Sequence, residues 1–190
     1  MKKPRVVLDA CVLIPQYLRD VLLSVAWADL YHLYWSEHLL TEIKRNLIKQ
    51  YQLTPSKASK LILTMNKAFS GAMVEVPLEL INLMSNDLKD RHVLATAIVA
   101  KAEIIVTNNL ADFQPSSLES WEITAQSPDV FLTNLFNNYP EEIVQIIQKQ
   151  SSKYQNPKKS VLELLDFLGQ KASLSTFSSC VKSVLDRELS

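Results

Sequence analysis

The sequence is poor in the residues that build several common ligand sites. Glycine occurs only twice in 190 residues, at Gly71 and Gly169, which excludes the glycine-rich loops that cradle phosphates and dinucleotides. The two cysteines, Cys11 and Cys180, lie far apart and match no metal or redox spacing. We interpret them as reduced thiols of a cytoplasmic protein.

Charge of one sign and long hydrophobic runs are also missing. The formal net charge is zero, so no overall positive field indicates nucleic acid, and an RNA site would need a local cluster of lysine and arginine. No apolar run approaches the roughly 20 residues that span a bilayer, and Asp9 interrupts the apolar stretch that superficially resembles a secretory signal. We therefore expect no membrane segment. With 47% apolar residues, the chain is too hydrophobic to be disordered.

The sequence does contain an alternation of strand and helix patterns up to residue 126. Strands are expected over residues 6–8, 33–36, 73–76, 103–107 and 121–124, with helices between them. This alternation predicts the α/β class, a parallel sheet covered by helices on both faces. From residue 127 the strand patterns cease, and helices are expected over residues 127–138, 140–150, 161–168 and 174–189. Because about 60 residues form only a marginal core, we expect this extension, residues 127–190, to pack on the domain of residues 1–126.

Four carboxylates are placed where such a sheet would bring them together. The apolar run of residues 6–8 stops at Asp9, and chemistry in open parallel sheets sits beyond the carboxyl ends of the strands. Glu42 lies just beside the apolar stripe of its helix, and Asp90 shares a helix face with buried positions. Asp112 follows the strand of residues 103–107. We expect these four acids to converge.

Each of these acids also has a plainer interpretation. Glu42 could be an ordinary solvated helix residue, and Asp90 a first-turn residue favoured by the helix dipole, with Asp87 as the cap. Asp112 could form an Asx turn or a cap. Thr107 could hydrogen-bond a neighbouring carboxylate or simply end its strand. Spacing alone leaves these alternatives open.

The residue types at this edge favour a hard cation. Four like charges cannot share a dry pocket without a counter-ion, and a set of oxygen ligands suits Mg²⁺ or Mn²⁺. The three histidines, His32, His38 and His92, show no zinc-ligand spacing. A carboxylate-bound Mg²⁺ that keeps several waters can activate one of them and stabilise a leaving oxygen on phosphorus. The implied chemistry is hydrolysis of a phosphodiester.

Four short motifs carry a family resemblance. They are VLDACVL at residues 7–13, LTEI at 40–43, DRHVLATA at 90–97 and IVTNNLADF at 105–113. In this order and at these separations, they resemble the PIN domain, a family of metal-dependent ribonucleases that includes the VapC-type toxins of prokaryotic toxin–antitoxin systems. The resemblance covers roughly residues 4–126.

The resemblance implies a fold, a site and an activity. The fold would be a five-stranded parallel sheet sandwiched by helices, with the helical extension following it. Asp9, Glu42, Asp90 and Asp112 would be the catalytic acids, and all of them except Glu42 would bind Mg²⁺ or Mn²⁺. The activity would be endoribonucleolytic hydrolysis of RNA, as the toxin of a VapBC-type pair.

One position departs from the family pattern. Many members carry an acid where this chain has Asn109, so the third metal ligand could be Asp112, Asn109 or both. Thr107 and Asn109 are therefore secondary site candidates. The branch of the family with an Asn-x-x-Asp-Phe ending and a helical continuation looks closest.

The expected partners follow from the same resemblance. RNA would be held by local positive charge, with Arg91, Lys44 and Arg45 as the nearest candidates. VapC-like relatives are inhibited by a cognate antitoxin whose tail occupies the acidic groove, and a homodimer is left open. The alternative is a catalytically silent domain that binds RNA or a partner. A haloacid dehalogenase-type phosphotransferase is disfavoured, since it needs a second aspartate where Cys11 stands.

Overall fold

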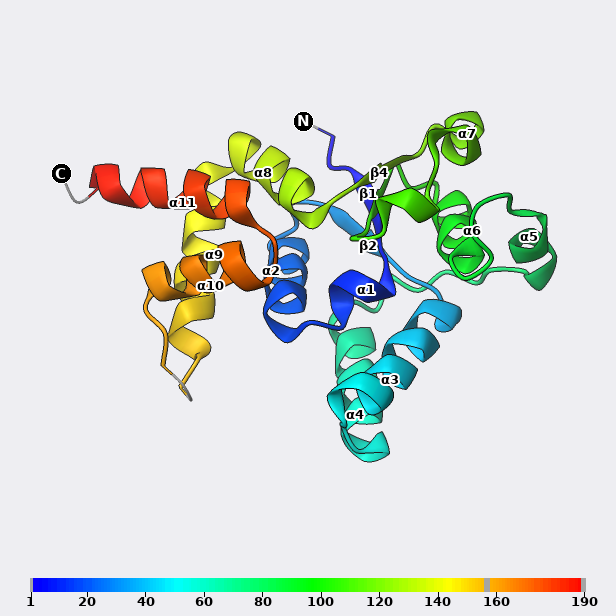
Figure 1. Cartoon of the computed structure of the whole chain (residues 1–190), viewed down its shortest axis with the longest axis horizontal. Helices are drawn as coiled ribbons and strands as arrows, with labels where there is room; N and C mark the ends of the chain where they lie inside the picture. The colour runs from blue at the N-terminus through cyan, green and yellow to red at the C-terminus, as the bar shows by residue number, and fades with distance from the viewer. Residues whose placement is uncertain (1, 156–157, 189–190) are drawn as a thin grey trace. The chain divides into compact units, whose positions relative to one another are not determined.

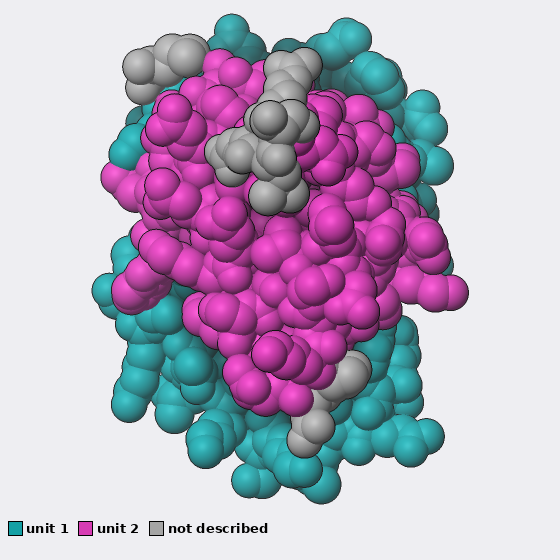
Figure 2. All heavy atoms as spheres, turned by 90° about the vertical axis from the view of Figure 1, so that its left-hand side faces the viewer, with its two compact units in different colours: residues 1–14, 31–126 teal, residues 15–30, 127–190 magenta. Residues whose placement is uncertain are grey.

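The computed structural model describes residues 2–155 and 158–188, and they form two compact units (Figure 2). The first, which we call the sheet unit, comprises residues 1–14 and 31–126. The second, the helical unit, comprises residues 15–30 and 127–190. Each unit is described below by itself.

The sheet unit is built on four parallel strands (Figure 1). They are β1 (Arg5–Leu8), β2 (His32–Tyr34), β3 (Ile104–Val106) and β4 (Thr124–Gln126), in the order β2-β1-β3-β4. Strand β1 is internal, and its Val6, Val7 and Leu8 side chains are completely buried, as the continuous apolar run predicts. The predicted α/β class with a parallel sheet is confirmed.

The third of the five expected strands, residues 73–76, is wrong for the described chain, because pairing there is limited to one bridge between Met73 and Trp35. The Trp35 N–H donates to the Ala72 carbonyl and the Val74 N–H donates to the Trp35 carbonyl, both at 2.9 Å. Beyond this bridge the partner segment ends, because Ser36 follows Trp35 directly and caps the next helix. Helix α5 (Leu78–Leu83) begins after Pro77. The ladder therefore stops after one residue.

The last strand is also displaced from its expected position. Residues 121–124 were expected to pair, but Trp121 ends a 3₁₀ turn, η2 (Glu119–Trp121). Glu122 then adopts a left-handed conformation with φ of 56°, which a strand residue cannot keep. The chain straightens only at Thr124, where β4 begins.

The helices of the sheet unit are α1 (Ala10–Leu13), α3 (Glu37–Tyr51), α4 (Pro55–Ala68), α5, α6 (Arg91–Ala100) and α7 (Pro115–Leu118). Two of them, α3 and α4, begin at a side-chain cap. Thr54 caps α4 by accepting from the Lys57 N–H, with Pro55 in the first turn. Ser36 caps α3 in the same way. Helix α6 packs on β1, β2 and β3, whereas α3 lies beside α4 (Figure 1).

The described residues of the helical unit form five helices. They are α2 (Gln16–Trp27), α8 (Pro128–Asn138), α9 (Pro140–Lys153), α10 (Val161–Lys171) and α11 (Ser175–Glu188). Helix α2, which the sequence analysis included in the nuclease domain, packs on α9. The Tyr154 hydroxyl donates to Asp20 at 2.7 Å, and the Gln150 side chain donates to the Tyr17 carbonyl at 3.3 Å. The extension thus shares its core with α2, and its expected packing on the sheet unit stays a prediction.

The described residues contain no helix that combines the length and the apolar character needed to cross a membrane.

Candidate acidic active site

Asp9 lies at the carboxyl end of β1 and is held there by hydrogen bonds. Its backbone N–H donates to the Val106 carbonyl at 3.0 Å, which continues the pairing of β1 with β3. The Asp9 residue is only 2% exposed. Its Oδ2 accepts a hydrogen bond of 2.7 Å from the Thr107 hydroxyl. Of the two interpretations of Thr107, the one that bonds it to a neighbouring carboxylate is therefore correct.

Cys11 is a second partner of Asp9, which the sequence analysis did not identify. Its Sγ donates to the Asp9 Oδ2 at 3.0 Å and accepts from the Asn108 N–H at 3.3 Å. Burial, together with the negative charge of Asp9, raises the pKa of the Cys11 thiol to about 12. The residue therefore acts as a neutral hydrogen-bond donor and a poor nucleophile. Its place two residues after Asp9 in the one-turn helix α1 was the available signal.

Asp90 stands at the N-cap position of α6 and is 7% exposed. Burial first, and then the negative charges of Asp9, Asp112 and Glu42, raise the pKa of Asp90 to about 7. A hydrogen bond with the Asp112 side chain acts in the same direction. The four acids singled out from the sequence are therefore close enough for their charges to interact.

Asp87, which was the expected cap of α6, has another role. Its Oδ1 accepts from the Lys89 N–H at 3.0 Å, so it caps the turn that precedes the helix. Asp90 occupies the N-cap position instead, but its side chain makes no capping hydrogen bond. The carboxylate of Asp90 is directed to the other acids rather than to its own helix.

Glu42, near the middle of α3, faces α6. Its Oε2 lies 3.0 Å from the His92 Nε2, and its Oε1 accepts a long bond of 3.5 Å from the Asn46 side chain. Both side chains of the ion pair are largely buried, at 23% exposure for Glu42 and 15% for His92. The sequence analysis placed Glu42 correctly beside the apolar stripe, but it did not identify His92 as its partner.

Asp112 and Asn109 differ in how they approach the acids. Asp112 ends the 3₁₀ turn η1 (Leu110–Asp112) and hydrogen-bonds Asp90. The Asn109 backbone N–H donates to the Thr107 hydroxyl at 2.9 Å, and the residue is exposed. Among the two ligands left open by the sequence, the geometry favours Asp112, whereas Asn109 supports the threonine that holds Asp9.

The donor set suits a hydrated divalent cation. Within the described ranges, no three acidic, histidine or cysteine side chains are close enough to form a ready coordination shell. The acids nevertheless repel one another, as the raised pKa of Asp90 shows. A cation that retains several waters, as Mg²⁺ does, would relieve that repulsion without demanding direct bonds to every carboxylate.

An open hollow of about 690 Å³ adjoins Glu42 between α3, α5 and α6. Arg45 from α3 and Lys89 from the turn before α6 supply positive charge, and Leu78 and Ile81 supply an apolar wall. Its other lining residues are Glu37, His38, Thr41, Glu42 and His92. Of the predicted RNA-binding residues, Arg45 lines this hollow, whereas Arg91 and Lys44 are not among its lining residues.

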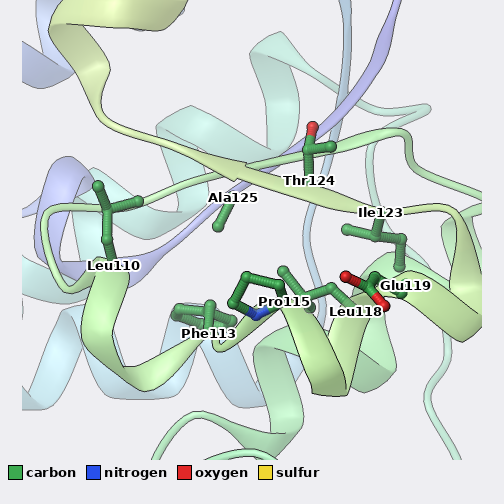
Figure 3. A pocket seen from close by; sticks show the side chains of 8 residues that line it. All are labelled: Leu110, Phe113, Pro115, Leu118, Glu119, Ile123, Thr124 and Ala125. Carbon is green, nitrogen blue, oxygen red and sulfur yellow. The ribbon is translucent and has the colours of Figure 1, made fainter.

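A second hollow, of about 440 Å³, lies against β4 (Figure 3). Figure 3 shows Phe113, Pro115 and Leu118 gathered on one side of the strand, with Ala125 pointing toward them. Glu119 is the ionisable side chain in its lining. The hollow is therefore largely apolar, and we assign it no chemistry.

Acids gathered at the carboxyl edge of a parallel α/β sheet define the general class of protein, and comparison with known families agrees. Residues 5–111 match the PIN domain model, so the chain belongs to the PIN domain family. The matched range contains Asp9, Glu42 and Asp90, and Asp112 lies one residue beyond it.

A narrower similarity extends into the helical unit. Residues 128–183 match the model described as the VapC50 C-terminal domain. The chain is also 40% identical over 93 residues to a protein of Mycobacterium tuberculosis (strain ATCC 25618 / H37Rv) named "Putative ribonuclease VapC50". That match covers 49% of this chain and 55% of the relative, so the chain spans about half the length of the curated relative it matches.

Proposed function

We propose that this protein is a metal-dependent endoribonuclease that hydrolyses RNA phosphodiester bonds, and that it acts as a VapC-type toxin. The observation that carries the proposal is the convergence of Asp9, Glu42, Asp90 and Asp112, seen in the pKa of Asp90. Four separated segments of the chain contribute these acids, and strongly perturbed carboxylates of this kind are typical of functional sites. Membership of the PIN family supports the same activity.

Asp9, Asp90 and Asp112 are the proposed ligands of Mg²⁺ or Mn²⁺. A bound divalent ion would supply an activated water and stabilise the charge that develops on the leaving oxygen. Thr107 and Cys11 hold the Asp9 carboxylate in one orientation at the strand end. Glu42 approaches the acids from α3 and is placed to accept a hydrogen bond from the attacking water.

The RNA strand is proposed to follow the hollow beside Glu42. Arg45 and Lys89 would bind phosphates there, since acidic groups surround the reacting position itself. Leu78 and Ile81 offer an apolar surface to a base or sugar. Arg91 and Lys44, predicted from the sequence, would contribute only at longer range.

An antitoxin that inserts a basic side chain among the acids is the proposed protein partner. Such a side chain would neutralise the same repulsion that a metal ion relieves. The resemblance to VapC-type toxins supports this partner, and a homodimer and a cytoplasmic location stay predictions.

The alternative is a domain that binds RNA without cutting it. The lack of a ready coordination shell among the described residues favours this reading, as does the neutral Asn109. The dependence of cleavage on metal ions distinguishes a nuclease from a domain that only binds RNA. A nuclease cleaves RNA with Mg²⁺ or Mn²⁺ and stops with EDTA, whereas a binding domain retains RNA under both conditions.

The test is cleavage of end-labelled single-stranded and structured RNA by the purified chain, with Asp90→Asn and Asp87→Asn as matched variants. We expect Asp90→Asn to abolish cleavage and to relieve any growth arrest on expression. Asp87→Asn, three residues earlier and outside the acid cluster, should retain cleavage. Metal-dependent cleavage by Asp90→Asn at the wild-type rate would refute the assignment.

A further inference from the structure

We infer that His92 is a positioning residue that fixes the Glu42 carboxylate for RNA cleavage. The inference rests on the proposed function and deepens it, because it assigns a role to a side chain outside the acidic quartet. The main observation that supports it is the 3.0 Å separation between the His92 Nε2 and the Glu42 Oε2.

Glu42 needs such a partner because its side chain is otherwise weakly held. A glutamate side chain has several rotatable bonds and gains entropy when it is free in solvent. Its Oε1 has only the long 3.5 Å contact with Asn46. Arg45, three residues further along and so at a spacing that allows pairing, would hold it through a flexible chain. The shorter imidazole of His92 restricts it more strongly.

The contact with His92 couples the position of the Glu42 side chain to that of α6. It lies within the first turn of that helix, whose N-cap is Asp90. The contact therefore ties one catalytic acid to the helix that carries another. Removing the imidazole would let Glu42 drift relative to Asp90 without altering any of the four acids.

A second polar link joins the same two helices, so the contact at His92 is not needed to dock them. The hydroxyls of Thr96 on α6 and Ser36 at the N-cap of α3 lie 2.8 Å apart. Thr96 also donates to the His92 carbonyl at 2.6 Å. This link should survive when the His92 side chain is removed, so we expect a larger effect on catalysis than on stability.

The contact between His92 and Glu42 leaves hydrogen-bonding capacity for a further group. Both the His92 Nε2 and the Glu42 Oε2 are buried, and neither takes part in a hydrogen bond of standard geometry. Their 3.0 Å approach is thus a close polar contact. Buried polar atoms are rarely left in that state, and here they border the hollow that we assign to RNA. A water or a substrate oxygen would complete the pair.

The first experiment compares kcat and KM for cleavage of a short RNA with Mg²⁺. His92→Ala should lower kcat by about 10- to 100-fold and leave KM within about twofold. His92→Gln, whose amide can still donate to Glu42, should recover most of the loss. His32→Ala is the matched control, because His32 pairs with Arg5 at the amino end of the strands, whereas Asp9 follows the carboxyl end of β1. It should match the wild type.

A double-mutant cycle tests whether His92 acts through Glu42. Glu42→Gln alone should be strongly impaired, and adding His92→Ala to it should cause no further loss. An equal fractional loss from His92→Ala in both backgrounds would overturn the inference. If Glu42→Gln were fully active, or if no variant cleaved RNA, the proposed function itself would fail.

A spectroscopic measurement tests the contact between His92 and Glu42 independently of cleavage. In ¹⁵N-detected histidine spectra of the intact chain, Glu42→Gln should shift the His92 ring resonances and leave those of His32 in place. Thermal unfolding of the same variants identifies any that fail to fold. Unchanged His92 resonances in a folded Glu42→Gln protein would contradict the positioning role, whatever the activity.

Discussion

At the residue scale, the candidate site depends on side chains that hold the acids as much as on the acids themselves. Asp9 has two donors on the same oxygen, Thr107 and Cys11. Both donors are neutral, so they orient the carboxylate without cancelling the charge that a metal ion would need. Asp90, by contrast, is surrounded by other acids.

The pKa of Asp90 leads to a prediction on stability without metal. Because its pKa is about 7 when folded and about 4 when unfolded, the folded state binds more protons. Its contribution to stability is therefore complete below about pH 4 and is lost as the pH rises through 7. In EDTA, the melting temperature of Asp90→Asn should equal that of the wild type at pH 4. At pH 8 it should be several degrees higher, given ~2–4 °C for each kcal/mol. Thermal melts of both proteins across this pH range check the prediction. A difference in melting temperature that does not change with pH would contradict it.

Thr107 offers a test of how far positioning of Asp9 matters. Thr107→Val keeps the shape of the side chain but removes the donor to the Asp9 Oδ2. We expect a loss of about 10- to 100-fold in metal affinity or activity, as for other groups that orient metal ligands. Thr107→Ser retains the hydroxyl and is the matched control. Equal activities of the two variants would show that Cys11 alone suffices.

At the scale of elements, local capping signals mark some helix starts, and contacts between helices fix how others meet. Thr54 and Pro55, a capping residue followed by proline, start α4. In the helical unit, the Asp129 carboxylate on α8 accepts from the backbone N–H groups of Thr176 and Phe177 in the first turn of α11. One side chain thereby joins two helices that lie far apart in the sequence.

Asp129→Ala should therefore destabilise the protein by ~1–2 kcal/mol, the range of a lost helix cap. The control is Asp166→Ala, which removes a partly exposed ion pair with Lys182, and such pairs contribute little. Chemical denaturation of both variants measures the difference. A larger loss for Asp166→Ala would contradict the assigned importance of the α8–α11 link.

At the scale of the whole molecule, neutral net charge conceals a separation of charges within the sheet unit. The acids meet at the strand ends, and Arg45 and Lys89 lie in the hollow next to them. Under the proposed function, RNA would approach this site where the cations are, and a divalent ion would accompany it to the acids.

RNA binding should consequently depend on those two cations. In an Asp90→Asn background that prevents cleavage, the pair Arg45→Ala and Lys89→Ala should weaken RNA binding by about tenfold and reduce its salt dependence by about one to two phosphate contacts. The control pair, Lys57→Ala and Lys60→Ala on α4, removes the same charge elsewhere. Binding curves at several salt concentrations check this, and equal effects of both pairs would mean that only net charge matters.

The PIN domain fold was predictable in outline because its signals are local or strongly repeated. The apolar run of β1 and the acid that follows it could be located without coordinates, as could Asp90 on α6. The sequence alone could not tell whether residues 73–76 form a strand. That depends on whether the neighbouring segment continues alongside the chain beyond the bridge between Trp35 and Met73. It does not, because Ser36 follows Trp35 directly and caps α3.

The sequence by itself determined the parallel α/β class, the helix caps and which acids to examine, since these depend on periodicity and on residue types at short range. Only the tertiary structure decided that residues 15–30 share a core with the C-terminal helices. It also decided that Cys11 bonds Asp9 and that His92 meets Glu42. Such contacts depend on how distant segments are aligned to within an ångström, and no pattern along the chain records that alignment.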